Sequence, residues 1–248
     1  MRTCIHRTLA VILLLAIDLG CKKFDGGQPD ETRGYDSYQD IPGVTQDEII
    51  AIEELRRQGT AFVYGMHKST EAFTREDGEI QGFSALFCHW LTQLFGIPFR
   101  PALYGFDDLI EGLATGEIDF TGELMATDER REMYLMTDAI AERTLKYFQL
   151  VNSSPLLEIA KQRPLRYALI KYSNMIDAVI SKLKDGTFEI VLLNSIAQAY
   201  DKLKSGEIDA FLISSVAEAN FEYYDDIVAR DFFPLISKPV SMSTRNPK

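Results

Sequence analysis

The most informative part of the sequence runs from Gly116 to Arg130 and reads GEIDFTGELMATDER. Gly116 is placed to end a helix, and Ile118-Asp119 leads into a short strand. A small-residue loop around Gly122 follows, and Thr127 opens another helix. Ligands of open α/β sheets sit at the carboxyl ends of strands, and helix N-termini attract anions. The stretch therefore predicts one half of a small-molecule site.

The opening phrase of this stretch returns about ninety residues later, at Gly206-Glu207-Ile208-Asp209. Around both copies, short apolar strands alternate with helices, as at 84–95 and 99–103. This alternation predicts an α/β fold of two similar lobes with largely parallel sheets and a ligand cleft between them. We interpret Asp119 and Asp209 as structural residues at the start of strands.

Composition excludes several functions. The 248 residues suffice for one large or two modest domains, and the net charge of −11 argues against a nucleic-acid-binding face. The sequence has no Gly-rich phosphate loop, no Ser/His/Asp arrangement and no zinc-ligand spacing. We therefore expect no cofactor, no metal and no catalytic group.

Cys88 and His89 are adjacent on a helix, so we expect a packed thiol and a surface imidazole.

The N-terminus resembles an export signal. Basic residues precede an apolar run from Leu9 to Ile17, which is too short to span a membrane comfortably. Leu19-Gly20-Cys21 resembles a bacterial lipobox, in which Cys21 is lipidated, although Asp18 stands where an apolar residue is usual. Residues 1–21 are thus predicted to be a signal peptide of lipoprotein type. An uncleaved anchor and a buried N-terminal strand are the alternatives.

Four further segments follow from the patterning. Residues 22–45 are polar and rich in Gly and Asp, which predicts a flexible tether. Thr45 and Glu48 have capping-box spacing at the start of the next helix. We expect lobe 1 to comprise 46–148 and 236–248, and lobe 2 to comprise 149–235.

Ordered motifs identify a family resemblance. They are F-x-x-x-x-G-E-I-x-G-F at 73–83, FDDLIEGLATGEIDF at 106–120, T-D-E-R followed by M-T-D, and LKSGEIDAFLIS at 203–214. Together they resemble the bacterial extracellular solute-binding proteins of family 3 over about residues 60–248. The resemblance implies a two-lobed, type II periplasmic-binding-protein fold with two hinge crossovers. It also implies closure around a small polar solute, commonly an amino acid.

The resemblance assigns ligand-binding roles to particular positions. Arg130 matches the arginine that grips the ligand carboxylate, a bidentate pairing that suits a guanidinium. Ser173 matches the residue that completes this clamp from the second lobe. The other matched or neighbouring positions are Glu123, Met125, Phe73 and Glu71, and Thr127 is read first as the helix cap.

Two departures from the family bear on the ligand. Ser214 stands where an acidic residue usually holds an α-ammonium group, and Thr70 stands near the position of the usual stacking aromatic. Glu71 and Glu123 are the carboxylates that we expect to face a cationic group instead. Family members also continue beyond the phrase at 243–247 into a final helix, so a truncated gene or a missing following module is expected.

These observations predict a monomeric, extracytoplasmic protein that captures a small polar, carboxylate-bearing solute and is not an enzyme. Its partner is expected to be an ABC-type permease or a membrane signalling protein, with the membrane reached through the lipid anchor. One alternative is a cyclohexadienyl-dehydratase-like enzyme on the same fold, for which Glu123 is the candidate acid or base. The other is a degenerate, non-binding interaction module.

Overall fold

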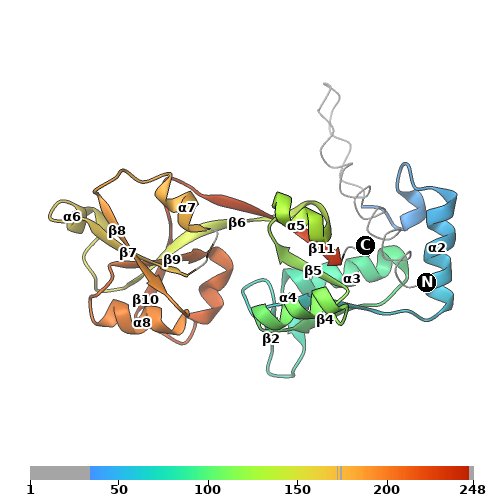
Figure 1. The fold of residues 1–248 in the computed structure, drawn as a ribbon. Helices are drawn as coiled ribbons and strands as arrows, with labels where there is room; N and C mark the ends of the chain where they lie inside the picture. The colour runs from blue at the N-terminus through green and yellow to red at the C-terminus, as the bar shows by residue number, and fades with distance from the viewer. Residues whose placement is uncertain (1–33, 172, 174, 246–248) are drawn as a thin grey trace, which may run out of the picture. The chain divides into compact units, whose positions relative to one another are not determined.

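The computed structural model describes residues 34–171, 173 and 175–245, and the chain forms two compact units (Figure 1). One unit extends to Glu142 and resumes at Pro239, and the other is Arg143–Lys238. The chain thus passes between the units twice, within strands β6 (Tyr134–Leu150) and β11 (Ser237–Arg245). These crossings fall at 142/143 and 238/239, whereas the lobe boundaries were expected at 148/149 and 235/236. The predicted signal peptide with Cys21 lies outside the described residues.

The sheet of the first unit has the strand order β4-β1-β5-β11. Strand β1 is parallel to both β4 and β5, whereas β11 is antiparallel to β5. The elements are η1 (Tyr38–Asp40), α2 (Gln46–Arg57), β1 (Phe62–Met66), β2 (Phe73–Thr74), β3 (Ile80–Gln81), α3 (Phe83–Phe95), β4 (Phe99–Leu103), α4 (Phe106–Thr115), β5 (Phe120–Leu124) and α5 (Asp128–Met133).

Aromatic side chains fill the core of this unit. Phe62 packs edge-on against Phe120 at 5.2 Å between ring centroids, and Phe99 contacts both rings. Helix α3 adds a buried face that includes Cys88, while His89 is exposed, so the expectation for this pair is confirmed. Burial raises the pKa of the Cys88 thiol to about 12.

The prediction of a flexible tether is wrong for the last part of residues 22–45. Tyr38 and Ile41 are each 2% exposed and belong to the core cluster of the first unit. The Tyr38 ring stacks on Phe95 at 6.0 Å, and its hydroxyl donates a hydrogen bond to Glu53. The composition of this segment is polar on average, and it therefore gave no indication that Tyr38 and Ile41 are buried. The capping box at Thr45 is confirmed.

The second unit has its own sheet, in which β7 is parallel to β8 and β9, and β6 is antiparallel to β9 and β10. Its elements are α6 (Leu156–Ala160), β7 (Leu165–Ile170), α7 (Met175–Ile180), β8 (Phe188–Leu193), α8 (Ala197–Lys204), β9 (Ala210–Ser214), η2 (Ser215–Asn220) and β10 (Ile227–Asp231). The apolar side chains of α7 and α8 belong to two separate core clusters.

The repeated Gly-Glu-Ile-Asp phrase has the same backbone conformation and burial in each unit. Gly116 and Gly206 have φ angles of 84° and 70°, values that favour glycine after a helix. The following isoleucines, Ile118 and Ile208, are buried at 0% and 2% exposure. The phrase therefore turns the chain at the helix end and anchors the turn in the core.

The aspartate of each phrase binds the backbone of the neighbouring parallel strand. Val63 N–H donates to Asp119 Oδ2 at 2.8 Å, and Asp119 N–H donates to the Val63 carbonyl at 3.0 Å. Asp209 makes the same pair of bonds with Arg166, both at 2.8 Å. Both aspartates are thus structural, as predicted, and make Val63 and Arg166 equivalent positions.

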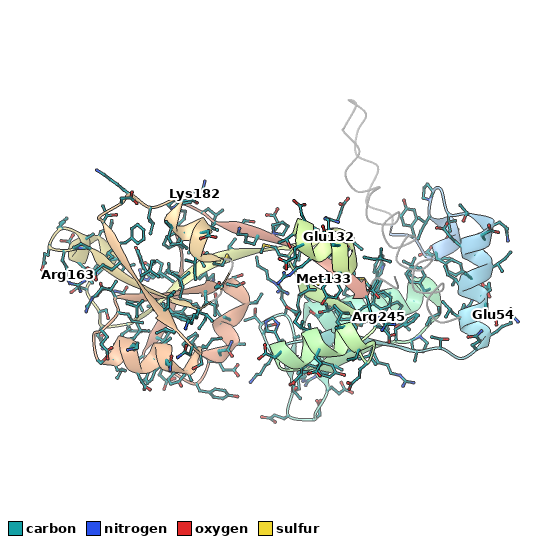
Figure 2. All side chains as sticks on the ribbon, viewed as in Figure 1. Glu54, Glu132, Met133, Arg163, Lys182 and Arg245 are labelled. Atoms are coloured by element: carbon teal, nitrogen blue, oxygen red, sulfur yellow. The ribbon has the colours of Figure 1, made fainter. Side chains whose placement is uncertain are left out.

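Asp209 carries a second layer of contacts. The guanidinium of Arg163, labelled in Figure 2, donates to both carboxylate oxygens at 2.6 Å, and Arg166 Nη2 adds a bond at 3.1 Å. Burial alone raises the pKa of Asp209, but these donors and the Arg166 N–H outweigh it and lower the pKa to about 2. The Asp209 carboxylate is therefore ionised in the folded protein at neutral pH.

Three elements near the crossovers were not anticipated by the sequence analysis. Strand β6 is long because the chain is already extended at Tyr134, directly after α5 ends at Met133. Residues Ser215–Asn220 form a short 3-10 helix, and β10 follows it. No helix among the described residues has the length and apolarity needed to cross a membrane.

We predict that Asp209→Asn lowers the free energy of unfolding by about 1.5–3 kcal/mol, as expected for lost hydrogen bonds to charged groups. The lower end is favoured because Arg163 is 41% exposed and solvent screens this pair. The depressed pKa stabilises the fold above about pH 4, and this contribution is lost as the pH falls towards about 2. Urea denaturation at pH 7 and pH 3 measures both effects. Asp185→Asn, on an exposed turn, is the control, and equal losses in the two variants would contradict the prediction.

Candidate functional site

Arg130 is held in place by the loop that precedes its own helix. Thr127 caps α5 by accepting the Arg130 N–H at 3.2 Å. The guanidinium Nη1 folds back and donates to the Met125 carbonyl at 3.1 Å. A guanidinium has five N–H donors, and this bond uses one of them. The structure thus brings three predicted site residues together just beyond the carboxyl end of β5.

Glu123 is part of β5 and its side chain is only 2% exposed. Its Oε2 lies 2.9 Å from Nδ1 of His67, the residue that directly follows β1. This is a close polar contact, and His67 Nδ1 has no directed hydrogen bond among the described residues. A buried carboxylate needs such partners, because burying an isolated charge is costly.

His67 was discounted as a site residue, because a single histidine without partners in the sequence is usually solvent-exposed. The signal was its position after a strand, because β1 and β5 are parallel neighbours whose carboxyl ends meet at one edge. Gly122, beside Glu123, is also required by this packing. A Cβ atom there would collide with the Tyr64 hydroxyl and crowd Ile140. The edge is therefore closely packed around Glu123.

Glu71 and Phe73 lie on the hairpin side of the first unit. The Glu71 carbonyl accepts the Ser84 N–H at 3.0 Å, which ties it to the start of α3. Phe73 is 38% exposed. Phe83, which the sequence analysis did not single out, is 45% exposed and stacks on Phe87 at 6.0 Å. An aromatic residue at the first position of a helix, before the buried face, could have indicated it. We therefore add Phe83 to the candidate ligand-binding residues.

The candidates of the second unit lie at the carboxyl ends of adjacent parallel strands. Ser173 follows β7, and its Oγ accepts the Met175 N–H at 3.2 Å at the start of α7. Ser214 ends β9, and its buried Oγ has no hydrogen-bond partner within the described part of the chain. Four residues later, Glu218 is bound by Lys146. Each unit thus has its own group of candidates.

Among residues 34–171, 173 and 175–245, no three His, Cys, Asp or Glu side chains are grouped to hold an ion. Glu123 and His67 are the pair with acid–base character in the first unit's group. The arrangement otherwise consists of a guanidinium, hydroxyls, carboxylates and exposed aromatic rings, which is suited to binding a polar solute.

We predict that His67→Ala lowers the free energy of unfolding by about 1–3 kcal/mol, because it removes a polar partner from a buried carboxylate. His67→Gln should recover part of this loss, since a side-chain amide can again place a polar group beside the carboxylate. Chemical denaturation measures both variants. His89→Ala, at the exposed imidazole of α3, is the matched control, and a loss as large as that of His67→Ala would refute the proposed contact.

Comparisons with known proteins give a consistent result. The sequence profile of bacterial extracellular solute-binding proteins, family 3, matches residues 62–187. Among curated proteins, none matches the sequence. The structure is similar to the periplasmic VFT2 domain of Bordetella pertussis BvgS, with a TM-score of 0.65 and 14% identity over 80% of this chain and 86% of that one.

Two further structures have similar folds. Holo arginine-binding protein from T. maritima has a TM-score of 0.55 and 22% identity, over 78% of this chain and 85% of that one. An ancestral cationic amino acid solute-binding protein, AncCDT-1, has a TM-score of 0.55 and 20% identity over the same shares. These similarities confirm the predicted fold class, an α/β fold of the two-lobed, type II periplasmic-binding-protein kind.

Proposed function

Because the chain belongs to the bacterial extracellular solute-binding proteins of family 3, we propose that it captures a small polar, carboxylate-bearing solute outside the cytoplasm. The observation that carries this proposal is the placement of Arg130. Its guanidinium is oriented by Met125 and its helix is capped by Thr127. A planar guanidinium can pair with both oxygens of a carboxylate, which a point charge cannot match in geometry.

The proposed mechanism is a shift between conformations. A solute that is held by Arg130 of the first unit and Ser173 of the second gains contacts only when both units reach it. Such a solute stabilises the closed state relative to the open one, in proportion to its differential affinity for the two. The crossovers within β6 and β11 are the segments that would accommodate the motion.

The contacts of Glu123 bear on the ligand class. Its carboxylate is buried beside His67, which supports a packing role more than the pairing with a ligand cation that the sequence suggested. Ser214 offers a hydroxyl where an acid would hold an α-ammonium group. An organic acid, or an amino acid whose amine is bound through Glu71, is therefore the solute class that we propose.

The downstream partner is proposed to be an ABC-type permease or a membrane signalling protein. Family membership supports an extracytoplasmic location. The likeness to a periplasmic domain of BvgS makes the sensory role a specific candidate. We also propose that Cys21 is lipidated, which would hold the chain at the membrane in either role.

We predict that at least one solute in a screen of organic acids, amino acids and polyamines raises the melting temperature, because a ligand of the native state stabilises it by mass action. Arg130→Ala should abolish the shift. Arg131→Ala is the matched control, since this neighbour is exposed and bonds only weakly to Met136 at 3.4 Å. A screen without any shift would favour a non-binding module, and an equal shift in Arg130→Ala would refute the site.

An enzyme of the cyclohexadienyl-dehydratase kind is the second candidate, and the Glu123–His67 contact is the observation that favours it. A carboxylate and an imidazole 2.9 Å apart could exchange a proton with a substrate. We expect no aromatic product when the purified chain is incubated with prephenate or arogenate. Product formation that disappears in Glu123→Gln would replace the binding proposal with this one.

A further inference from the structure

Among the described residues, strand β8 has an unpaired edge, whereas the edge of the equivalent strand in the first unit is blocked. In the strand order, β4 and β8 are the terminal strands. The aspartate contacts make Val63 and Arg166 equivalent. The strand registers then make Phe99 of β4 equivalent to Phe188 of β8, so the two edges can be compared residue by residue.

The edge of β4 is blocked. Phe62 N–H donates to the Pro98 carbonyl and Tyr104 N–H to the Met66 carbonyl, both at 2.8 Å. By the alternation of a strand, the backbone groups of Phe99, Pro101 and Leu103 point away from β1. The Phe99 N–H is bound by Thr92 Oγ1 at 2.9 Å, and Pro101 has no N–H. Proline at such a position is a known means of preventing a further strand from pairing.

The edge of β8 is open. Leu165 N–H donates to the Thr187 carbonyl at 3.0 Å and Lys171 N–H to the Leu193 carbonyl at 2.8 Å. The backbone groups of Phe188, Ile190 and Leu192 therefore point away from β7.

No hydrogen bond within the described residues involves these outward groups, and the next outward N–H, that of Asn194, is taken by Gln198 Oε1. Ile190 stands where β4 has Pro101. Leu192 is 50% exposed, as is expected of a strand that lacks a covering neighbour.

In place of the monomer expected from the sequence, we propose that a second copy of this chain pairs with β8 in antiparallel orientation, centred on Ile190. In this register the outward groups of Phe188 face those of Leu192 of the second copy, and Ile190 faces its own equivalent. Every outward N–H and C=O then finds a partner, because hydrogen-bonded antiparallel pairs exchange both bonds. The proposal is independent of the solute.

Side chains fit the same register. Phe188 and Ile190 pack on the cluster that includes Val179, and strand alternation puts Leu192 on the same face. Leu192 would contact Phe188 of the second copy, an aromatic–aliphatic pair of the kind that stabilises sheets. Glu189, the strand's one charged residue, would face Val191, so no like charges are opposed. This self-complementarity is the reason to name a second copy as the occupant.

The overall charge predicts the response to salt. Each copy carries a net charge of −11, so two copies repel each other at long range. Salt screens this repulsion, whereas backbone hydrogen bonds and apolar contacts persist. Association through β8 should therefore strengthen as the salt concentration rises, the opposite of an interface held by surface ion pairs.

Sedimentation velocity of the purified full chain, from micromolar to millimolar concentration, tests the proposal. We expect concentration-dependent dimers. Ile190→Pro removes the outward N–H without removing a bond to β7, and should weaken dimerisation about tenfold. Leu192→Lys leaves the strand backbone intact and should weaken it as well, which covers the case in which the proline variant does not fold. Leu157→Lys, at a 79% exposed leucine of α6, is the matched control.

Hydrogen exchange locates the interface directly. The amides of Ile190 and Leu192 should gain protection as dimers form, while β4 should not change. A chain that stays monomeric at every concentration would overturn the proposal. So would dimers that leave the exchange of β8 unchanged, or dimers that persist equally in Ile190→Pro and Leu192→Lys.

Discussion

The bond between an aspartate and the backbone of a neighbouring parallel strand is the constraint on which both units depend. Parallel strands are joined by long connections, so their register is not set by a tight turn. Asp119 and Asp209 supply this information by fixing one residue of β1 and β7, respectively. With the register fixed, the carboxyl ends of adjacent strands are aligned, and the residues that follow them become neighbours.

The two units use this constraint to different extents. Asp209 also binds two guanidinium groups, from Arg163 and Arg166, which makes it a charged junction as well as a register mark. In the first unit, Tyr38 from the segment before α2 joins the core and bonds to Glu53. The same phrase thus tolerates different surroundings, and the terminal strands have diverged as well, with a proline in β4 and an isoleucine in β8.

Local signals in the sequence were sufficient for much of the fold. Gly96 and Pro98 set the end of α3 and the start of β4, and the expected span of β4 agrees with the structure. The cap at Thr127 was also predictable, because a hydroxyl before a helix has few other roles. Patterns within one segment are enough for such features, since the interacting groups are close in sequence.

Features that depend on distant contacts were not predictable. The polar segment before α2 has an ordinary tether composition, and only the packed structure shows that Tyr38 meets Phe95. His67 was discounted because its partner, Glu123, is distant in sequence and becomes a neighbour only through the pairing of β1 with β5. Strand β10 was missed because its pattern is weak and its pairing with β6 is long-range.

In the proposed function, a carboxylate-bearing solute is held by residues of both units and shifts the chain towards a closed state. Small-angle X-ray scattering with and without a solute that binds the chain measures this shift. We expect a smaller radius of gyration at saturation, and no such change in Arg130→Ala. A solute that saturates the wild-type chain while leaving its radius of gyration unchanged would contradict it.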